Sequence, residues 1–190
     1  VNNGFTNPIQ GYTSIGNANL KAEHANSLEL GLRGKLDGDK LRWQLSAYHN
    51  RYRDFIKQQQ VSGPPATPLM VFQYVNLNEV EIEGLEARLM WPPIAGLDLS
   101  GAWAKARGHS RTAGIDTPLD TVQPERFSLS ARYEIGSWSL QTKWMHAAAK
   151  KATDSALASN FLTPSHDVID IGGSYRLTPS VIVSAFITTL

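Results

Sequence analysis

The chain has 190 residues, of which 42% are hydrophobic, and its 18 basic and 17 acidic residues leave a net charge of +1. This balance, without a basic stripe, argues against a nucleic acid as partner, and the absence of cysteine excludes disulfides, zinc–thiolate sites and thiol nucleophiles. No apolar run reaches the ~18 residues that a transmembrane helix needs, whereas a membrane β-strand needs an apolar residue only at every second position.

Residues 1–24 are rich in Asn, Gly, Thr and Pro and show little periodicity, which predicts a loop. The first strand is predicted at about residues 25–36, where leucines alternate with charged residues. The leucines are Leu28, Leu30, Leu32 and Leu36, and the charged residues between them are Glu29, Arg33 and Lys35. Alternate side chains of a strand point to opposite faces, so this pattern gives one apolar and one polar face, which a helix could not do.

The rest of the chain repeats this pattern. Further strands are predicted at about residues 41–48, 70–91, 97–103, 127–133, 138–144, 169–177 and 181–187. Within strand 70–91 the apolar positions change parity at Gly84, which we interpret as a β-bulge, and the faces of this strand stay unassigned. Short turns near residues 37, 93, 135 and 179 alternate with long polar loops near 60, 115 and 155, which is typical of outer-membrane barrels.

The predicted fold class is therefore all-β, an antiparallel transmembrane β-barrel segment of about eight strands. Trp43, Trp91 and Trp138 lie near the short-turn ends of strands, as expected for an aromatic girdle at a membrane interface. Eight strands could close a small barrel. We favour a piece of a larger barrel, because residues 1–24 read as loop and the sequence stops at Leu190 without a terminal aromatic residue.

Three motifs resemble those of TonB-dependent outer-membrane receptors, most closely the haem and haemoglobin receptor branch. Residues 16–23 (GNANLKAE) and 26–34 (NSLELGLRG) are similar to the family's G-N-P-N-L-K-P-E and N-S-x-E-x-G-x-R-G elements. Residues 76–86 (NLNEVEIEGLE) resemble its N-x-x-x-A-x-I-x-G-x-E strand, and residues 183–190 (VSAFITTL) the approach to its N-L-F motif. Alanines stand where the first element has its two prolines, and Thr189 stands where the N-L-F motif has Asn.

The resemblance implies a receptor in the bacterial outer membrane that imports haem by TonB-coupled transport. Residues 1–24 would form an extracellular ligand-binding loop, and residues 25–190 the C-terminal part of a barrel of about 22 strands. The plug, the earlier strands and the last strand would lie outside this sequence. The implied partners are haem or a haemoprotein, the TonB energy-transducing complex acting through the plug, and outer-membrane lipid. No motif of an enzyme is present, so we expect transport without catalysis.

The resemblance further implies a haem ligand on the loop that precedes residues 16–23. That segment has no His before Asn17, so Tyr12 is our candidate axial ligand of the haem iron, because a phenolate is a hard anionic donor. Alternatively, Tyr12 anchors the loop by packing. His24 is the competing candidate, since imidazole is the commonest metal ligand, although it lies next to a strand start.

The other polar candidates have simpler explanations. Arg51, Arg53 and Lys57 could meet haem propionates, but basic residues just outside a bilayer also meet anionic lipid. The remaining histidines lie at strand ends or in loops without metal-ligand spacing; they are His49, His109, His146 and His166. Two alternative functions stay open: a receptor for a ferric siderophore, and a small structural or adhesive barrel.

Overall fold

The structure is a computed structural model that describes residues 4–38, 40–112, 114–157 and 160–189. It divides into two compact units. Unit 1 comprises Val1–Ser27, Asn50–Glu81 and His109–Thr117, and unit 2 comprises Leu28–His49, Ile82–Gly108 and Pro118–Leu190. Among the described residues, no helix has the length and apolar character needed to cross a bilayer.

Nearly all of the regular secondary structure in the described chain is strand. They are β1 (Phe5–Asn7), β2 (Tyr12–Ile15), β3 (His24–Leu36), β4 (Leu41–Ser62), β5 (Met70–Ile94), β6 (Leu97–Thr112), β7 (Ile115–Pro118), β8 (Arg126–Ile135), β9 (Trp138–Ala147), β10 (His166–Thr178) and β11 (Val181–Thr188). One short 3-10 helix, η1 (Ala152–Asp154), lies between β9 and β10. The parts of β4, β5 and β6 nearest the short turns belong to unit 2, and their other ends belong to unit 1.

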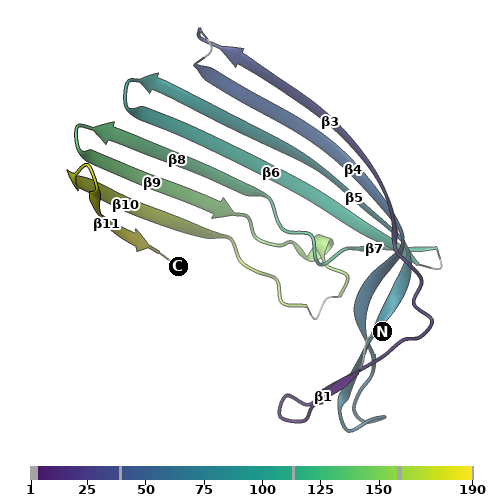
Figure 1. Cartoon of the computed structure of the whole chain (residues 1–190). Coiled ribbons are helices and arrows are strands. Elements are labelled where there is room, and N and C mark those ends of the chain that lie inside the picture. The colour runs from purple at the N-terminus through teal and green to yellow at the C-terminus, as the bar shows by residue number, and fades with distance from the viewer. Residues whose placement is uncertain (1–3, 39, 113, 158–159, 190) are drawn as a thin grey trace. The chain divides into compact units, whose positions relative to one another are not determined.

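In unit 2, neighbouring strands pair in the order β3, β4, β5, β6, β8, β9, β10, β11 (Figure 1). β8 pairs antiparallel with both β6 and β9; Leu99 lies opposite Ala131, for example, and Ser130 lies opposite Lys143. Tight turns join the two strands of a hairpin, and Gly96 and Gly136 adopt the positive φ angles of 81° and 57° that such turns require and glycine tolerates. The predicted succession of strands and short turns is confirmed.

The sheet of unit 2 has one apolar and one polar face, because directly opposed residues of paired strands share a face. Leu30, Leu129 and Ile171 on the apolar face are 68%, 46% and 57% exposed. Across both units, the described residues include only three buried apolar side chains, which are Val80, Leu119 and Ala147. This sheet therefore does not bury its leucines against a second layer, as a water-soluble sandwich would.

Unit 1 differs from the prediction, because part of the predicted loop 1–24 is paired strand. β1 and β2 form an antiparallel hairpin, and Thr6 Oγ1 and Thr13 Oγ1 lie 2.8 Å apart across it. Gly11, with a φ of 71°, lies in the turn between the two strands. β2 then pairs in parallel with the start of β5, where Tyr12 faces Met70. This parallel pair is an exception to the antiparallel arrangement that we predicted.

The predicted long loop near residue 60 is also mostly strand, since β4 continues through Ser62 and β5 begins at Met70. Residues 57–60 are polar, and polar composition of this kind predicts a loop. Strand pairing uses backbone groups, however, so a polar segment can still pair when its partner is in register. The connection between β4 and β5 is thus confined to residues 63–69.

Gly84 lies in a strand that runs without a break from Met70 to Ile94. A Cβ atom built on Gly84 would meet the ring of Tyr48 on β4, with Cε1 only 2.7 Å away. The absent side chain at residue 84 therefore makes room for Tyr48. Close approach of a neighbouring side chain is thus one reason for a glycine at this position, and the bulge there stays a prediction.

Candidate functional site

Tyr12, the predicted haem ligand, lies on β2 in unit 1 with its ring held between two phenylalanines. The ring centroids of Phe5 and Phe72 lie 5.6 and 6.0 Å away at nearly perpendicular interplanar angles of 84° and 86°. Such edge-to-face pairs contribute about 0.5–1.5 kcal/mol each beyond burial of their area. Among the described residues, the phenol oxygen has no hydrogen-bond partner. The ring is thus positioned by packing while its oxygen stays free to accept or to ligate.

His24, the competing candidate, is the first residue of β3 and is exposed. No hydrogen bond, ion pair or ring contact joins it to Tyr12 or to any other described residue. Within the described ranges, no group of three or more His, Asp or Glu side chains is placed to hold a metal ion. The structure therefore does not bring the two predicted ligands together.

The asparagines of the first and second motifs connect residues 16–23 to β5. Asn17 Nδ2 donates to the carbonyl oxygen of Tyr74 at 2.8 Å. The Asn76 side chain accepts from the Lys21 amide at 2.9 Å and donates to the carbonyl oxygens of Lys21 and Asp54 at 3.1 and 2.6 Å. Sequence matching found both motifs but assigned these asparagines no role. The structure shows that they fix the segment that follows the β1–β2 hairpin.

A cluster of charged residues in unit 1 comes from β4, β5 and the segment His109–Thr117. The Arg51 guanidinium pairs closely with Glu79 and lies 3.6 Å from Glu81. Both carboxylates also line a small cavity of about 80 Å³, together with His109, Arg111 and Asp116. Arg51 is thus already neutralised by protein carboxylates, which weakens its predicted role toward propionates. Arg53 has no ion-pair partner among the described residues.

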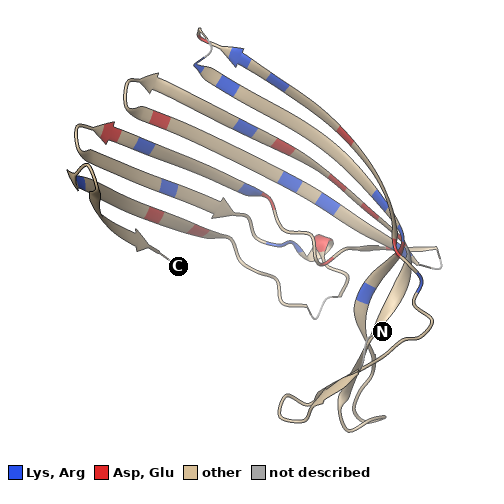
Figure 2. Cartoon of the chain, in the orientation of Figure 1, with Lys and Arg blue, Asp and Glu red and all other residues tan. Residues whose placement is uncertain are grey.

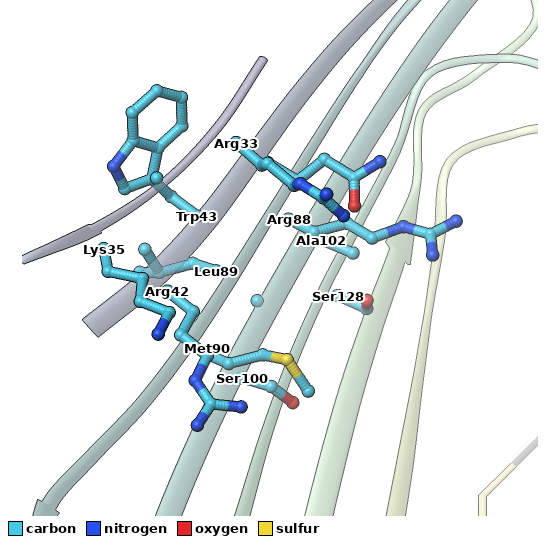
Figure 3. A pocket seen from close by; sticks show the side chains of 13 residues that line it. Arg33, Lys35, Arg42, Trp43, Arg88, Leu89, Met90, Ser100, Ala102 and Ser128 are labelled. Carbon is cyan, nitrogen blue, oxygen red and sulfur yellow. The ribbon is translucent and has the colours of Figure 1, made fainter. Parts of the chain in front are cut away.

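A second cavity, of about 630 Å³, opens on the polar face of unit 2. Its lining comes from five strands and comprises Arg33, Gly34, Lys35, Arg42, Trp43, Gln44, Arg88, Leu89, Met90, Ser100, Gly101, Ala102 and Ser128. Figure 3 shows the guanidinium groups of Arg33, Arg42 and Arg88 around one hollow, whereas the Trp43 ring points away from them. The basic positions on β3, β4 and β5 also appear in Figure 2. We call this cavity the arginine hollow.

Sequence reasoning placed Arg33 and Lys35 on a polar face but did not find the arginine hollow. Arg88 belongs to the strand whose faces were left unassigned, and Arg42 lies on a different strand from Arg33. The spacing of these residues along the chain carries no signal, because the register of pairing decides which side chains of neighbouring strands meet. From Leu85 to Trp91, every second residue is apolar. This alternation would have placed Arg88 on the opposite, polar face of the strand.

Two loops of unit 2 are joined by Asp120. Its carboxylate accepts from Ser155 Oγ at 2.9 Å and from the Ala156 amide at 3.0 Å, and the Lys150 ammonium donates to its backbone oxygen. Partial burial acts to raise the pKa of Asp120, but these hydrogen bonds and the charge of Lys150 outweigh it, so the pKa lies below its ordinary value. Residues 119–125 and 150–156 are thereby held together on the long-loop side.

The sheet of unit 2 has one apolar and one polar face, and long loops connect its hairpins. This is the arrangement of a membrane β-barrel wall. Comparison with known proteins agrees with it. The model of the family described as "TonB dependent receptor-like, beta-barrel" matches residues 1–190. The chain belongs to this family, whose barrels lie in the outer membrane of Gram-negative bacteria. The predicted fold class and location are confirmed, and the polar face of unit 2 is the face that lines a barrel interior.

Two curated relatives show how far the likeness extends. The chain is 26% identical over 188 residues to the iron-regulated outer membrane virulence protein of Vibrio cholerae serotype O1, covering 92% of this chain and 28% of that protein. It is 28% identical over 173 residues to the hemoglobin-haptoglobin utilization protein B of Neisseria meningitidis serogroup C, covering 77% of this chain and 21% of that protein. The chain thus spans about a quarter of the length of these relatives.

Solved structures share the fold. The copper transporter OprC superposes with a TM-score of 0.73 at 25% identity over 90% of this chain and 26% of that one. A ferric enterobactin receptor of Pseudomonas aeruginosa superposes with a TM-score of 0.68 at 20% identity, over 95% of this chain and 29% of that one. These proteins carry different cargoes according to their names, so the fold defines the receptor class without defining the cargo.

Proposed function

We propose that this chain is part of a TonB-coupled outer-membrane receptor that imports haem, and that Tyr12 contributes the iron ligand on the extracellular side. The observation that carries the proposal is the free phenol oxygen of Tyr12 on a ring held by Phe5 and Phe72. A phenolate is an established axial ligand of ferric haem, and the flanking aromatic rings offer edges to a flat macrocycle. One relative is named for the use of haemoglobin–haptoglobin, which supports the same cargo.

Strand length supports an extracellular position for unit 1. β4 has 22 residues and β5 has 25, whereas about 9–11 residues of a tilted strand cross a bilayer. The surplus residues lie on the side of the long connections, which face the outside in outer-membrane barrels. Unit 1 contains this surplus together with Tyr12, which supports an extracellular position for Tyr12.

Titration of hemin into the full-length receptor tests the proposal. We expect the wild type to shift the Soret band on binding, and Tyr12→Phe to lose the tyrosinate-type spectrum and bind on the order of tenfold more weakly. Tyr52→Phe is the matched control, because Tyr52 also lies in unit 1 and packs against an aromatic neighbour, Phe55, at 5.5 Å. A wild-type receptor without any Soret shift would refute the haem proposal. An unchanged spectrum in Tyr12→Phe would remove Tyr12 as the ligand.

A ferric siderophore is the second candidate cargo. The cluster of Phe5, Tyr12 and Phe72 can also pack against the aromatic rings of an iron chelate, with Tyr12 acting as a packing partner instead of a ligand. In that case Tyr12→Phe would retain binding, while Tyr12→Ala would weaken it. Uptake of radiolabelled iron supplied as haem or as ferric enterobactin, by cells that carry the full-length receptor, separates the two cargoes. Cells that take up neither would favour the structural-barrel alternative.

A further inference from the structure

Three aromatic rings lie in a row on the apolar face of unit 2, close to the strand ends that lead into the long connections. The aromatic row consists of Trp103 on β6, Phe127 on β8 and Trp144 on β9. Trp103 lies opposite Phe127, and Trp144 lies opposite the next residue on the same face of β8, so the three rings share the apolar face. The ring centroids of Phe127 and Trp144 are 5.5 Å apart. Long connections face the outside in outer-membrane barrels, which places the row at the level of the outer leaflet.

Both indole N–H groups of the row are held by carboxylates of the protein. Trp103 Nε1 donates to Glu125 at 2.7 Å, and Trp144 Nε1 donates to Asp167 at 2.8 Å. Asp167 also lies 2.9 Å from His146 Nδ1. An indole at a membrane interface otherwise directs its N–H to water or to lipid headgroups. These two rings are therefore fixed by the protein itself, and what they offer a ligand is the apolar surface of the ring.

Basic side chains continue the same face of β6 beyond the row. Lys105 and Arg107 follow Trp103 at every second position of the strand and are exposed. Lys105 Nζ lies 3.1 Å from Glu125, whereas Arg107 has no ion-pair partner among the described residues. The hydrogen bonds from Trp103 and Lys105 and the charge of Lys151 lower the pKa of Glu125. The positive charges of Lys105, Arg107 and Lys151 together exceed the single negative charge of Glu125.

This combination of groups fits the head of a phosphorylated glycolipid. Guanidinium and ammonium groups bind phosphate by charge-assisted hydrogen bonds. Sugar rings have apolar C–H faces that pack against indole rings, and sugar hydroxyl groups donate to carboxylates. Next to the row, the exposed side chains of Leu129, Ile169 and Ile171 offer an apolar surface to acyl chains. A phospholipid with a small head would use the cations and the apolar surface, but it has no sugar ring to pack against the indoles.

We propose that the aromatic row, together with Lys105 and Arg107, is a specific binding site for a phosphorylated glycolipid of the outer leaflet. The phosphate lies against the two cations, the sugar against the rings of Trp103 and Trp144, and the acyl chains along the apolar face. Membership of an outer-membrane family supplies the membrane in which such a lipid is met. The inference does not depend on haem as the cargo, so its failure would leave the proposed function untouched.

Native mass spectrometry of the full-length receptor in detergent tests the phosphate contact, because it counts the lipid molecules that each receptor retains. We expect Lys105→Gln/Arg107→Gln to bind diphosphoryl lipid A on the order of tenfold more weakly at one site, and to bind dephosphorylated lipid A as the wild type does. Arg132→Gln/Lys143→Gln is the matched control on the polar face. It also removes one ion-paired cation, Arg132, and one cation, Lys143, that has no ion pair to a described residue. This control should bind as the wild type does.

Hydroxyl-radical footprinting of the wild-type receptor tests the position of the sugar. Diphosphoryl lipid A should slow the oxidation of Trp103 and Trp144 more than phosphatidylglycerol does at the same concentration. Trp43 and Trp138 lie near the short turns and should be oxidised equally in the two lipids.

Removal of the rings gives a second measurement. Trp103→Leu/Trp144→Leu keeps an apolar surface without indoles, and we expect it to bind both forms of lipid A on the order of tenfold more weakly. Trp138→Leu is the control and should bind as the wild type does. If the double leucine variant does not assemble, the footprinting of the wild type decides the role of the rings.

The inference fails on any of three results. Phosphatidylglycerol that binds as tightly as diphosphoryl lipid A and protects Trp103 and Trp144 equally would reduce the row to an ordinary aromatic girdle. Equal binding of diphosphoryl lipid A by the Lys105→Gln/Arg107→Gln variant and by its control would remove the phosphate contact. Binding without protection of Trp103 and Trp144 would place the glycolipid elsewhere on the barrel.

Discussion

The indole ring of Trp43 on β4 lies directly over Gly34 on β3, so that a Cβ atom added to Gly34 would come within 2.6 Å of indole atom Cε2. Both residues lie on adjacent strands of unit 2, at the end of the first hairpin near its short turn. The ring covers the bare backbone of the glycine, and such aromatic–glycine pairs help to fix the register of neighbouring strands. This contact ties a tryptophan of the expected interfacial girdle to a specific glycine on its neighbour.

We predict that Gly34→Ala destabilises the first hairpin by about 1–3 kcal/mol, because Trp43 must move off its position. Tryptophan fluorescence of the folded receptor in detergent should change in wavelength, and the denaturation midpoint should fall. Gly31→Ala is the control on the same strand, since a Cβ atom there would meet nothing closer than the Leu45 carbonyl oxygen at 4.0 Å. Equal stability of the two variants would show that Trp43 does not depend on Gly34.

Asn76 provides the second prediction, since one side chain bonds to the backbone of two other segments. Asn76→Ala should free Lys21 and its neighbours from β5, because three hydrogen bonds disappear at once. We expect a local loss of about 1–3 kcal/mol, seen as faster hydrogen exchange of the Lys21 amide. Asn26→Ala is the control, because the Asn26 side chain has no hydrogen bond to another described residue. Protection of Lys21 that survives in Asn76→Ala would contradict the assigned role.

The charged cluster of unit 1 leads to the third prediction. Arg51→Ala leaves Glu79 and Glu81 without their shared cation, so these carboxylates repel each other. Because Arg51 is 46% exposed, we expect only about 0.5–1 kcal/mol of lost stability, which added salt should reduce. Arg53→Ala removes an equal charge nearby without breaking an ion pair to a described residue, and it should have little effect. Thermal unfolding in low and high salt, with the same detergent, measures the difference.

The fourth prediction concerns pH and Asp120. A carboxyl whose pKa is lower in the folded than in the unfolded state stabilises the fold above its ordinary pKa of 3.8. This stabilisation disappears as the pH falls through the lower, folded value. Acidification below 3.8 should therefore release residues 150–156 from residues 119–125, detected as cleavage by pepsin within these loops.

Two variants check the assignment to Asp120. Asp120→Asn should be cleaved at neutral pH by a neutral protease as readily as the acidified wild type is by pepsin, because the charged acceptor is gone. Asp154→Asn should behave like the wild type, because within the described ranges the Asp154 carboxylate accepts only from the adjacent Thr153 hydroxyl, at 3.3 Å. Cleavage of both variants to the same extent would assign the acid sensitivity to another group.

Period-two alternation of apolar and polar residues was sufficient to predict the strands of unit 2 and their order. Each side chain there lies on either the apolar or the polar face of the sheet. The leucines from Leu28 to Leu36 therefore alternate with charged residues. The turns at Gly96 and Gly136 were also predictable, because a tight turn often needs a positive φ angle, which glycine adopts readily. Family membership followed from short motifs, which need no structure to be compared.

Tertiary structure alone decided which distant residues meet. The parallel pairing of β2 with β5, the three bonds of Asn76 and the gathering of Arg33, Arg42 and Arg88 all depend on register between strands. Register is set by backbone hydrogen bonds and packing between segments, which leave no periodic trace in either strand alone. Residues 57–60 are a second case in which the side-chain pattern was insufficient. Their polar side chains indicated a loop, but backbone pairing makes them part of β4. Side-chain pattern reports the environment of a residue, whereas the identity of its neighbours depends on the pairing of whole segments.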